Sequence, residues 1–114
     1  MSPTSVQSGN TRVTVTLNGA FAGYAYWSKD PGGDINGDHK EDYGDSAIVY
    51  DGAADGWGLE TTVSGGQRAS TRGHNSPYWS GWAHSLGAEG TVVKMQICLV
   101  RGQAAACTVK EVTR

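Results

Sequence analysis

Hydrophobic and polar residues alternate with a period of two along most of the chain, and the helical period is nearly absent. Residues 12–17 place Val13, Val15 and Leu17 on one face and threonines on the other. This pattern is typical of a half-buried strand. Asn18-Gly19, which follows directly, is the residue pair that a tight hairpin turn favours.

The segment 21–27 alternates again after this turn. Phe21, Ala25 and Trp27 fall on one side, and Tyr24 and Tyr26 fall on the other. The two segments therefore predict a first β-hairpin with its apolar face toward a core.

Further short β-rich segments follow, each bounded by Gly or Asp. They cover residues 46–51, 56–63, 68–74, 91–100 and 107–112. The clearest sets Val93, Met95, Ile97 and Leu99 against polar neighbours. About seven short strands result, which predicts an all-β fold, a single-domain antiparallel β-sandwich.

Composition supports one domain. The chain has 114 residues, of which 38% are hydrophobic and 17 are glycine, enough for one modest core. We expect a flexible N-terminal segment at residues 1–11 and the β-sandwich domain at residues 12–114. The Ser, Thr and Gly in the first segment are typical of an exposed terminus of a secreted protein.

Charge and hydropathy exclude two classes of partner. Nine Lys and Arg against eleven Asp and Glu leave no basic face for phosphates, so we expect no nucleic acid partner. No apolar run approaches the roughly 20 residues that cross a bilayer, so we expect no membrane span.

The two cysteines point to a C-terminal disulfide-linked hairpin. Cys98 and Cys107 flank a short loop between two alternating segments, which brings them face to face. The alternative is a pair of reduced thiols. A metal pair lacks further ligands at a recognisable spacing.

An acidic stretch, "DINGDHKEDYGD", occupies residues 34–45 and has the oxygen spacing of a calcium loop. Side-chain oxygens, with one main-chain carbonyl at the seventh position, come from Asp34, Asn36, Asp38, Lys40, Asp42 and Asp45. One tight loop of this kind can wrap the six to eight oxygens that Ca²⁺ takes. The stretch resembles the calcium loops of dockerin-like extracellular repeats, which implies a structural Ca²⁺.

Two departures keep a second interpretation open. His39 stands where the calcium pattern has glycine, and Asp45 stands where it has a bidentate glutamate. The alternative is a solvated connection between two strands, kept soluble by its acids.

No catalytic motif stands out. The chain has three histidines but no nucleophile elbow, no zinc-protease helix motif and no phosphate-binding glycine loop. We therefore predict a protein that is not an enzyme, and keep a small enzyme or a protease inhibitor as an alternative.

The stretch 70–82 is the best candidate for a recognition surface. Aromatic and arginine side chains dominate binding hot spots because they bury large areas at low entropic cost. The candidates are Arg72, His74, Tyr78, Trp79 and Trp82. Tyr78, Trp79 and Trp82 also suit stacking on sugar rings, and the alternative is that these rings complete the core.

Residues 54–107, with the stretches "ADGWGLETTV", "RASTRGHNSPYWSGW" and "GTVVKMQICLVRG", resemble small secreted all-β proteins of actinomycetes. That group includes the adaptor subunits of umbrella toxin particles. The resemblance implies secretion and a protein partner, with residues 2–11 as a strand that could enter a partner's groove. We therefore expect a secreted, non-catalytic, protein-binding module, with carbohydrate binding as the alternative.

Overall fold

The computed structural model describes residues 2–7, 10–53, 56–63, 67–85 and 90–114, which form ten strands. Their bounds are β1 Ser2–Gln7, β2 Asn10–Leu17, β3 Ala20–Ser28, β4 Ser46–Asp51, β5 Gly58–Val63, β6 Arg68–Ser70, β7 Tyr78–Trp79, β8 Ala83–His84, β9 Val92–Arg101 and β10 Ala104–Thr113. In the described part of the chain, no helix is long and apolar enough to cross a membrane.

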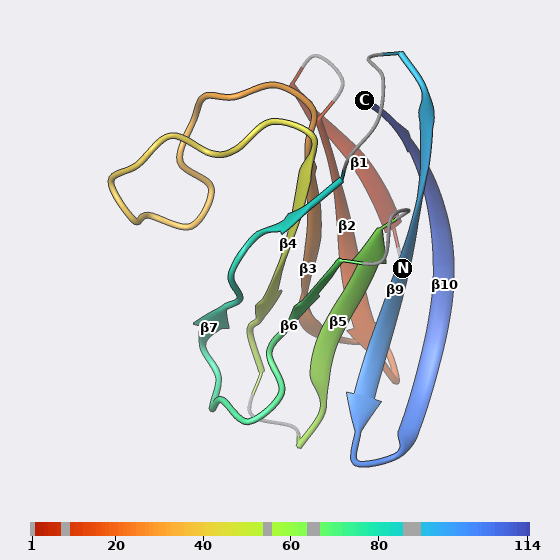
Figure 1. The fold of residues 1–114 in the computed structure, drawn as a ribbon. Coiled ribbons are helices and arrows are strands. Elements are labelled where there is room, and N and C mark those ends of the chain that lie inside the picture. Colours follow the sequence, from red (N-terminus) through yellow and green to blue (C-terminus); the bar gives the residue numbers. More distant parts are fainter. Residues whose placement is uncertain (1, 8–9, 54–55, 64–66, 86–89) are drawn as a thin grey trace.

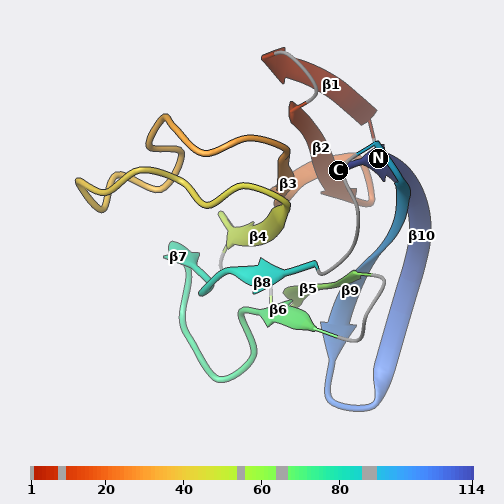
Figure 2. The ribbon, with the colours of Figure 1, turned by 45° about the horizontal axis from the view of Figure 1, so that its top comes forward.

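The strands form two antiparallel sheets that face each other (Figures 1 and 2). One sheet has the order β1-β2-β3-β4-β7, and β8 also pairs with β4. The other has the order β10-β9-β5-β6. The predicted antiparallel β-sandwich is thus confirmed, although the strands outnumber the seven expected because β7 and β8 are very short and β1 was not foreseen.

The N-terminal segment 1–11, expected to be flexible, contains a strand. Residues 2–7 form β1, which pairs with β2 and is the edge strand of its sheet. Proline and small polar residues weakened the strand signal in the sequence, but the partner β2 supplies the backbone hydrogen bonds that such a segment can use.

The core lies between the two sheets and comes from the alternating positions. Val13, Val15 and Trp27 from one sheet meet residues such as Met95 and Ile97 from the other, and all of them are almost fully buried. Alternation places these side chains on the inner faces because successive strand residues point to opposite sides.

The first hairpin forms as predicted, with one difference at Phe21. Asn18 and Gly19 adopt φ values of 51° and 81°, the positive values of a type I′ turn. The register shifts between Val15 and Thr16, because Val15 pairs with Gly23 and Thr16 with Phe21. The extra residue, Ala22, reverses the alternation, so Ala22 is buried and Phe21 is 42% exposed.

The C-terminal hairpin carries the predicted disulfide. Cys98 and Cys107 are direct register partners in β9 and β10, with Cα atoms 4.1 Å apart. The connecting loop has only two residues, and Gly102 at its first position has φ 57°, as a type II′ turn requires. The disulfide therefore joins strands that already pair along ten residues.

Candidate functional site

The residues predicted to form one recognition surface are divided among three places. Arg72 and His74 line a pocket at one end of the sandwich, and the His74 ring stacks on Tyr78 with centroids 3.8 Å apart. Trp79 packs against Tyr50, at 4.7 Å. Trp82 meets the exposed Tyr43 edge-on, at 6.2 Å, on the side of the acidic loop. Tyr78 and Trp79 are successive residues of β7 and point to opposite faces, and Trp82 lies between β7 and β8. The three rings have different neighbours, so the structure does not unite them in one platform.

A ladder of side chains crosses the outer face of the first sheet. The Arg12 guanidinium lies 4.7 Å from the Tyr24 ring centre, and Tyr24 stacks on Tyr50 at 5.9 Å. Trp79 continues the ladder beyond Tyr50. Cross-strand aromatic pairs of this kind stabilise a sheet. Each ring of the ladder therefore has a neighbouring side chain on at least one side.

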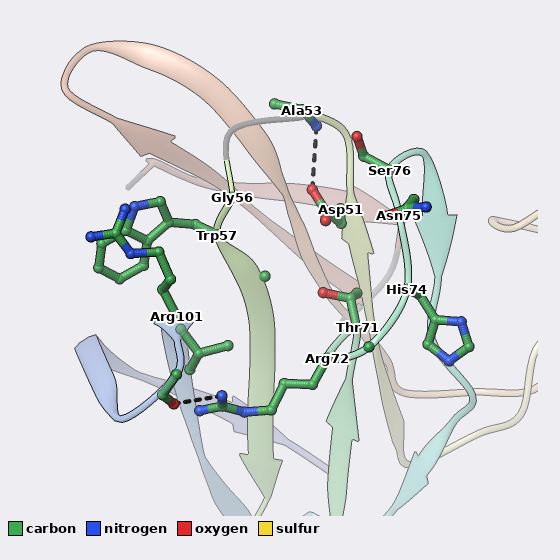
Figure 3. A pocket seen from close by; sticks show the side chains of 14 residues that line it. Asp51, Ala53, Gly56, Trp57, Thr71, Arg72, His74, Asn75, Ser76 and Arg101 are labelled. Carbon is green, nitrogen blue, oxygen red and sulfur yellow. Dashed lines mark hydrogen bonds between the residues drawn. The ribbon is translucent and has the colours of Figure 1, made fainter.

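Four segments form the walls of the pocket (Figure 3). They are the end of β4, the start of β5, the segment after β6, and the end of β9 with the β9–β10 loop. The pocket volume is about 630 Å³, within the range of small-molecule sites. Besides Arg72 and His74, its walls include Asp51, Trp57 and Arg101. These three were not predicted as site residues, because each lies near a strand end whose neighbours are set only by the sheet order.

Arg72 is held in place by two sequence-distant groups. Its Nε donates to Glu60 Oε2 at 2.6 Å, and its Nη1 donates to the Gly102 carbonyl at 2.7 Å. Ser70 Oγ donates to the same Glu60 oxygen at 2.8 Å and accepts the Arg72 N–H. Glu60 and Ser70 are direct register partners, so the β5–β6 pairing builds this network. In Figure 3 the Arg72 side chain extends along one side of the pocket, and its hydrogen bonds hold the guanidinium in place.

The pocket interior contains the buried carboxylate of Asp51 and the hydroxyl of Thr71, which is already hydrogen-bonded. Asp51 is 5% exposed and accepts the Ala53 N–H at 3.3 Å. Thr71 Oγ1 accepts the Leu59 N–H at 2.9 Å, so this hydroxyl holds the segment after β6 against β5. On the opposite wall the Arg101 guanidinium stacks over the Trp57 ring at 4.9 Å.

The acidic loop folds around its own backbone amides. Asp34 accepts the N–H groups of Asp38 and His39, and Asp38 accepts that of Lys40. Desolvation alone would raise the pKa of Asp34, but these backbone hydrogen bonds together lower it below its ordinary value. His39 has φ 63°, so it adopts the left-handed conformation that its place in the calcium pattern requires.

Asp42 holds the two sides of the connection between β3 and β4 together. It is 3% exposed and accepts the Ile35 N–H with both carboxylate oxygens, at 3.1 and 3.2 Å. Burial raises the pKa of Asp42, the Ile35 hydrogen bond opposes this, and the charges of Asp34 and Asp38 raise it further. Burial also raises the pKa of Tyr26, and Asp42 adds to that shift, so the loop lies close to the outer face of β3.

The other residues of the predicted calcium set lie at the loop surface or its end. Asn36 Oδ1 accepts the Asp38 N–H at 3.4 Å, Lys40 is exposed, and Asp45 has φ 50° where the loop enters β4. No group of three or more His, Cys, Asp or Glu side chains in the described ranges is arranged to hold a metal ion. Calcium binding, which also uses amide and carbonyl oxygens, stays a prediction.

Within the described ranges, Ser46 and His84 form a Ser–His pair whose geometry is structural. Ser46 Oγ lies 2.8 Å from His84 Nδ1, but Ser46 is fully buried and its hydroxyl also donates to the Gly44 carbonyl at 2.9 Å. Ser46 and His84 are register partners in β4 and β8. The contact therefore joins a short strand to the sheet.

The sheet edges differ in how they are protected. β1 contains Pro3 and a register shift between Ser5 and Gln7, and β6, β7 and β8 have three, two and two residues. Prolines, bulges and short length are the usual protections of an edge. β10 has ten residues in unbroken register with β9, and residues 104–109 are exposed and carry no charge.

The open side of β10 can be assigned from its hydrogen-bond alternation. The Cα separation of 4.1 Å places Cys98 and Cys107 at a narrow, non-hydrogen-bonded position. At such a position the main-chain N–H and C=O groups point away from the partner strand. Ala105, Val109 and Glu111 are separated from Cys107 by an even number of residues, so their main-chain groups also point away from β9. Trp27 Nε1 donates to the carbonyl of Thr113, which belongs to the same alternating set, at 3.1 Å. This contact is expected if the main-chain groups of the set point away from β9.

Comparison of the chain with protein-family models, with curated proteins and with solved structures finds no match. The resemblance to small secreted actinomycete proteins therefore stays a prediction.

Proposed function

We propose that this chain is a non-catalytic binding module that holds a protein partner by accepting one of the partner's strands at the free edge of β10. The observation that carries the proposal is the contrast between β10 and the other described edges. A long, regular edge with an uncharged stretch at residues 104–109 is a template for strand addition, and its main-chain groups would supply the affinity.

The disulfide supports this role. Cys98 and Cys107 hold β10 against β9 in the middle of the exposed stretch. A rigid edge loses little conformational entropy when a strand docks, which favours binding. The bond is also compatible with a secreted protein, since disulfides persist in oxidising compartments.

The side chains along β10 fit a partner strand of mixed sequence. Ala104, Ala105 and Ala106 are small, and Thr108 and Val109 are β-branched. Small side chains leave room for the larger side chains of an added strand. Lys110 and Glu111 follow the uncharged stretch and carry one charge of each sign. The added strand would therefore lie along residues 105–111.

A displayed random-peptide library selected on the purified chain tests the proposal. Val109→Pro removes an outward N–H without breaking the β9 ladder, and Val109→Thr keeps that N–H with a similar shape. Selected peptides should bind the wild type and Val109→Thr, lose binding to Val109→Pro, and slow hydrogen exchange at residues 105, 109 and 111. Peptides that bind Val109→Pro equally well would contradict strand addition.

A further inference from the structure

We propose that the pocket at the end of the sandwich, between Asp51, Trp57, Arg72 and Arg101, binds an uncharged carbohydrate ring. The pocket is formed by β4, β5, the segment after β6 and the β9–β10 loop. This inference rests on side chains away from the β10 edge and is independent of strand addition.

The charges at the pocket favour a neutral ligand. Arg72 and Arg101 each carry one positive charge, while Asp51 carries a negative charge and Glu60 neutralises Arg72 from behind at 2.6 Å. Since two positive and two negative charges stand at the pocket, its net charge is zero and favours neither an anion nor a cation overall. A polar but uncharged molecule suits it best.

The hydrogen-bonding groups match hydroxyls. A hydroxyl both donates and accepts, so a sugar needs donors and acceptors side by side. Asp51 has carboxylate oxygens on the pocket wall, and Arg101 supplies guanidinium donors. Arg72 keeps the donors of Nη2, because its Nε and Nη1 bind Glu60 and Gly102. Asn75 and Ser76 line the pocket, supply both kinds of group, and make no side-chain hydrogen bond to any described residue.

The site is set before a ligand arrives. Glu60 Oε2 and the Gly102 carbonyl fix Arg72 from two sides, and Trp57 fixes Arg101 by stacking. In Figure 3, Arg72 and the Arg101–Trp57 pair lie on adjoining walls, with Asp51 across from Arg72. Pre-positioned donors lower the entropy lost on binding. The planar Arg101–Trp57 stack offers a flat wall for the C–H groups of a sugar ring.

The pocket volume of about 630 Å³ suits a monosaccharide or the end of a short oligosaccharide. Exposed residues such as Gly73, Asn75 and Arg101 line the pocket, so a longer chain can continue into solvent. The ligand class we assign is therefore the neutral end of a glycan.

NMR titration of the ¹⁵N-labelled chain tests the proposal. The neutral probes are glucose, galactose, mannose, N-acetylglucosamine, maltose, cellobiose and chitobiose, and the acidic probes are sialyllactose and glucose 6-phosphate. The readouts are the Trp57 indole N–H, assigned with Trp57→Phe, and the backbone amides of Gly73 and Asn75. The test variants, Arg101→Ala and Asn75→Ala, change exposed side chains, and Arg68→Ala is the matched control because it removes an exposed arginine outside the pocket.

We expect saturable shifts at these readouts with at least one neutral sugar. Loss of a hydrogen bond to a charged group should weaken binding about tenfold or more in Arg101→Ala. Asn75→Ala should also weaken it, and Arg68→Ala should not. The proposal is overturned if no neutral probe shifts the readouts, if only acidic probes do, if the shifts centre on Trp79 or Trp82, or if both test variants bind as the wild type does.

Discussion

The indole N–H of Trp27 donates to the carbonyl oxygen of Thr113 across the sandwich, at 3.1 Å. Trp27 is fully buried in β3, and Thr113 ends β10. One side chain thus fills the core and ties the last residues of the chain to the opposite sheet.

Trp27→Phe tests this tie. The variant loses ring volume and the hydrogen bond, so we expect the free energy of unfolding to fall by about 1–3 kcal/mol. Urea unfolding measures the change. Trp79→Phe, a half-buried position on the outer face, should cost less, and equal losses in the two variants would contradict the special role of Trp27.

Removal of the disulfide should lower stability without changing the fold. Closing a loop between residues nine apart stabilises by about 2–3 kcal/mol in the chain-entropy account. Cys98→Ala/Cys107→Ala should lose that amount in urea unfolding. Reduced wild type should match the variant, and an unchanged midpoint would show that the pairing of β9 and β10 suffices.

Asp42 should make stability fall as pH rises through acid values. Burial raises the pKa of Asp42 in the folded state, so the folded protein holds this proton more tightly than the unfolded chain. Its contribution is complete below the unfolded pKa, about 3.9, and is lost as pH rises through the folded value. In calcium-free buffer, the stability of Asp42→Asn relative to wild type should therefore increase as pH rises from 3 to 7. A constant difference across this range would contradict the raised pKa.

Calcium should stabilise the acidic loop. Asp34 and Asp38 lie close enough to raise the pKa of Asp42, and a divalent cation would relieve that repulsion. Calorimetry on chelator-treated protein should give one site and a higher Tm in millimolar Ca²⁺. Asp38→Ala should abolish both effects and the exposed control Asp30→Ala should not, whereas no heat and no shift would leave the loop a solvated connection.

Proline in β10 should show which main-chain groups face outward. Ala106→Pro removes an N–H that pairs with β9, so we expect it to cost about 1–3 kcal/mol more than Val109→Pro. Thermal unfolding compares the two. A larger loss in Val109→Pro than in Ala106→Pro would mean that the N–H of Ala106, and not that of Val109, points away from β9. That result would contradict the assignment of Ala105, Val109 and Glu111.

The sequence by itself determined the fold class, the first hairpin and the C-terminal disulfide. These features depend on neighbours along the chain: side-chain alternation decides which residues share a face, and Asn18-Gly19 and Gly102 favour tight turns. Cys98 and Cys107 meet because a two-residue loop fixes the register of their strands.

Only the tertiary structure decided which distant residues meet. The bulge at Ala22 turned Phe21 outward, and the order of strands in the sheets brought Trp79 to Tyr50 and Arg72 to Glu60. The pocket depends on the same order, because its walls come from the ends of strands that are far apart in sequence. Local patterns specify a strand and its faces, whereas the pairing of strands is chosen by the packing of the whole core, which no short stretch of sequence contains.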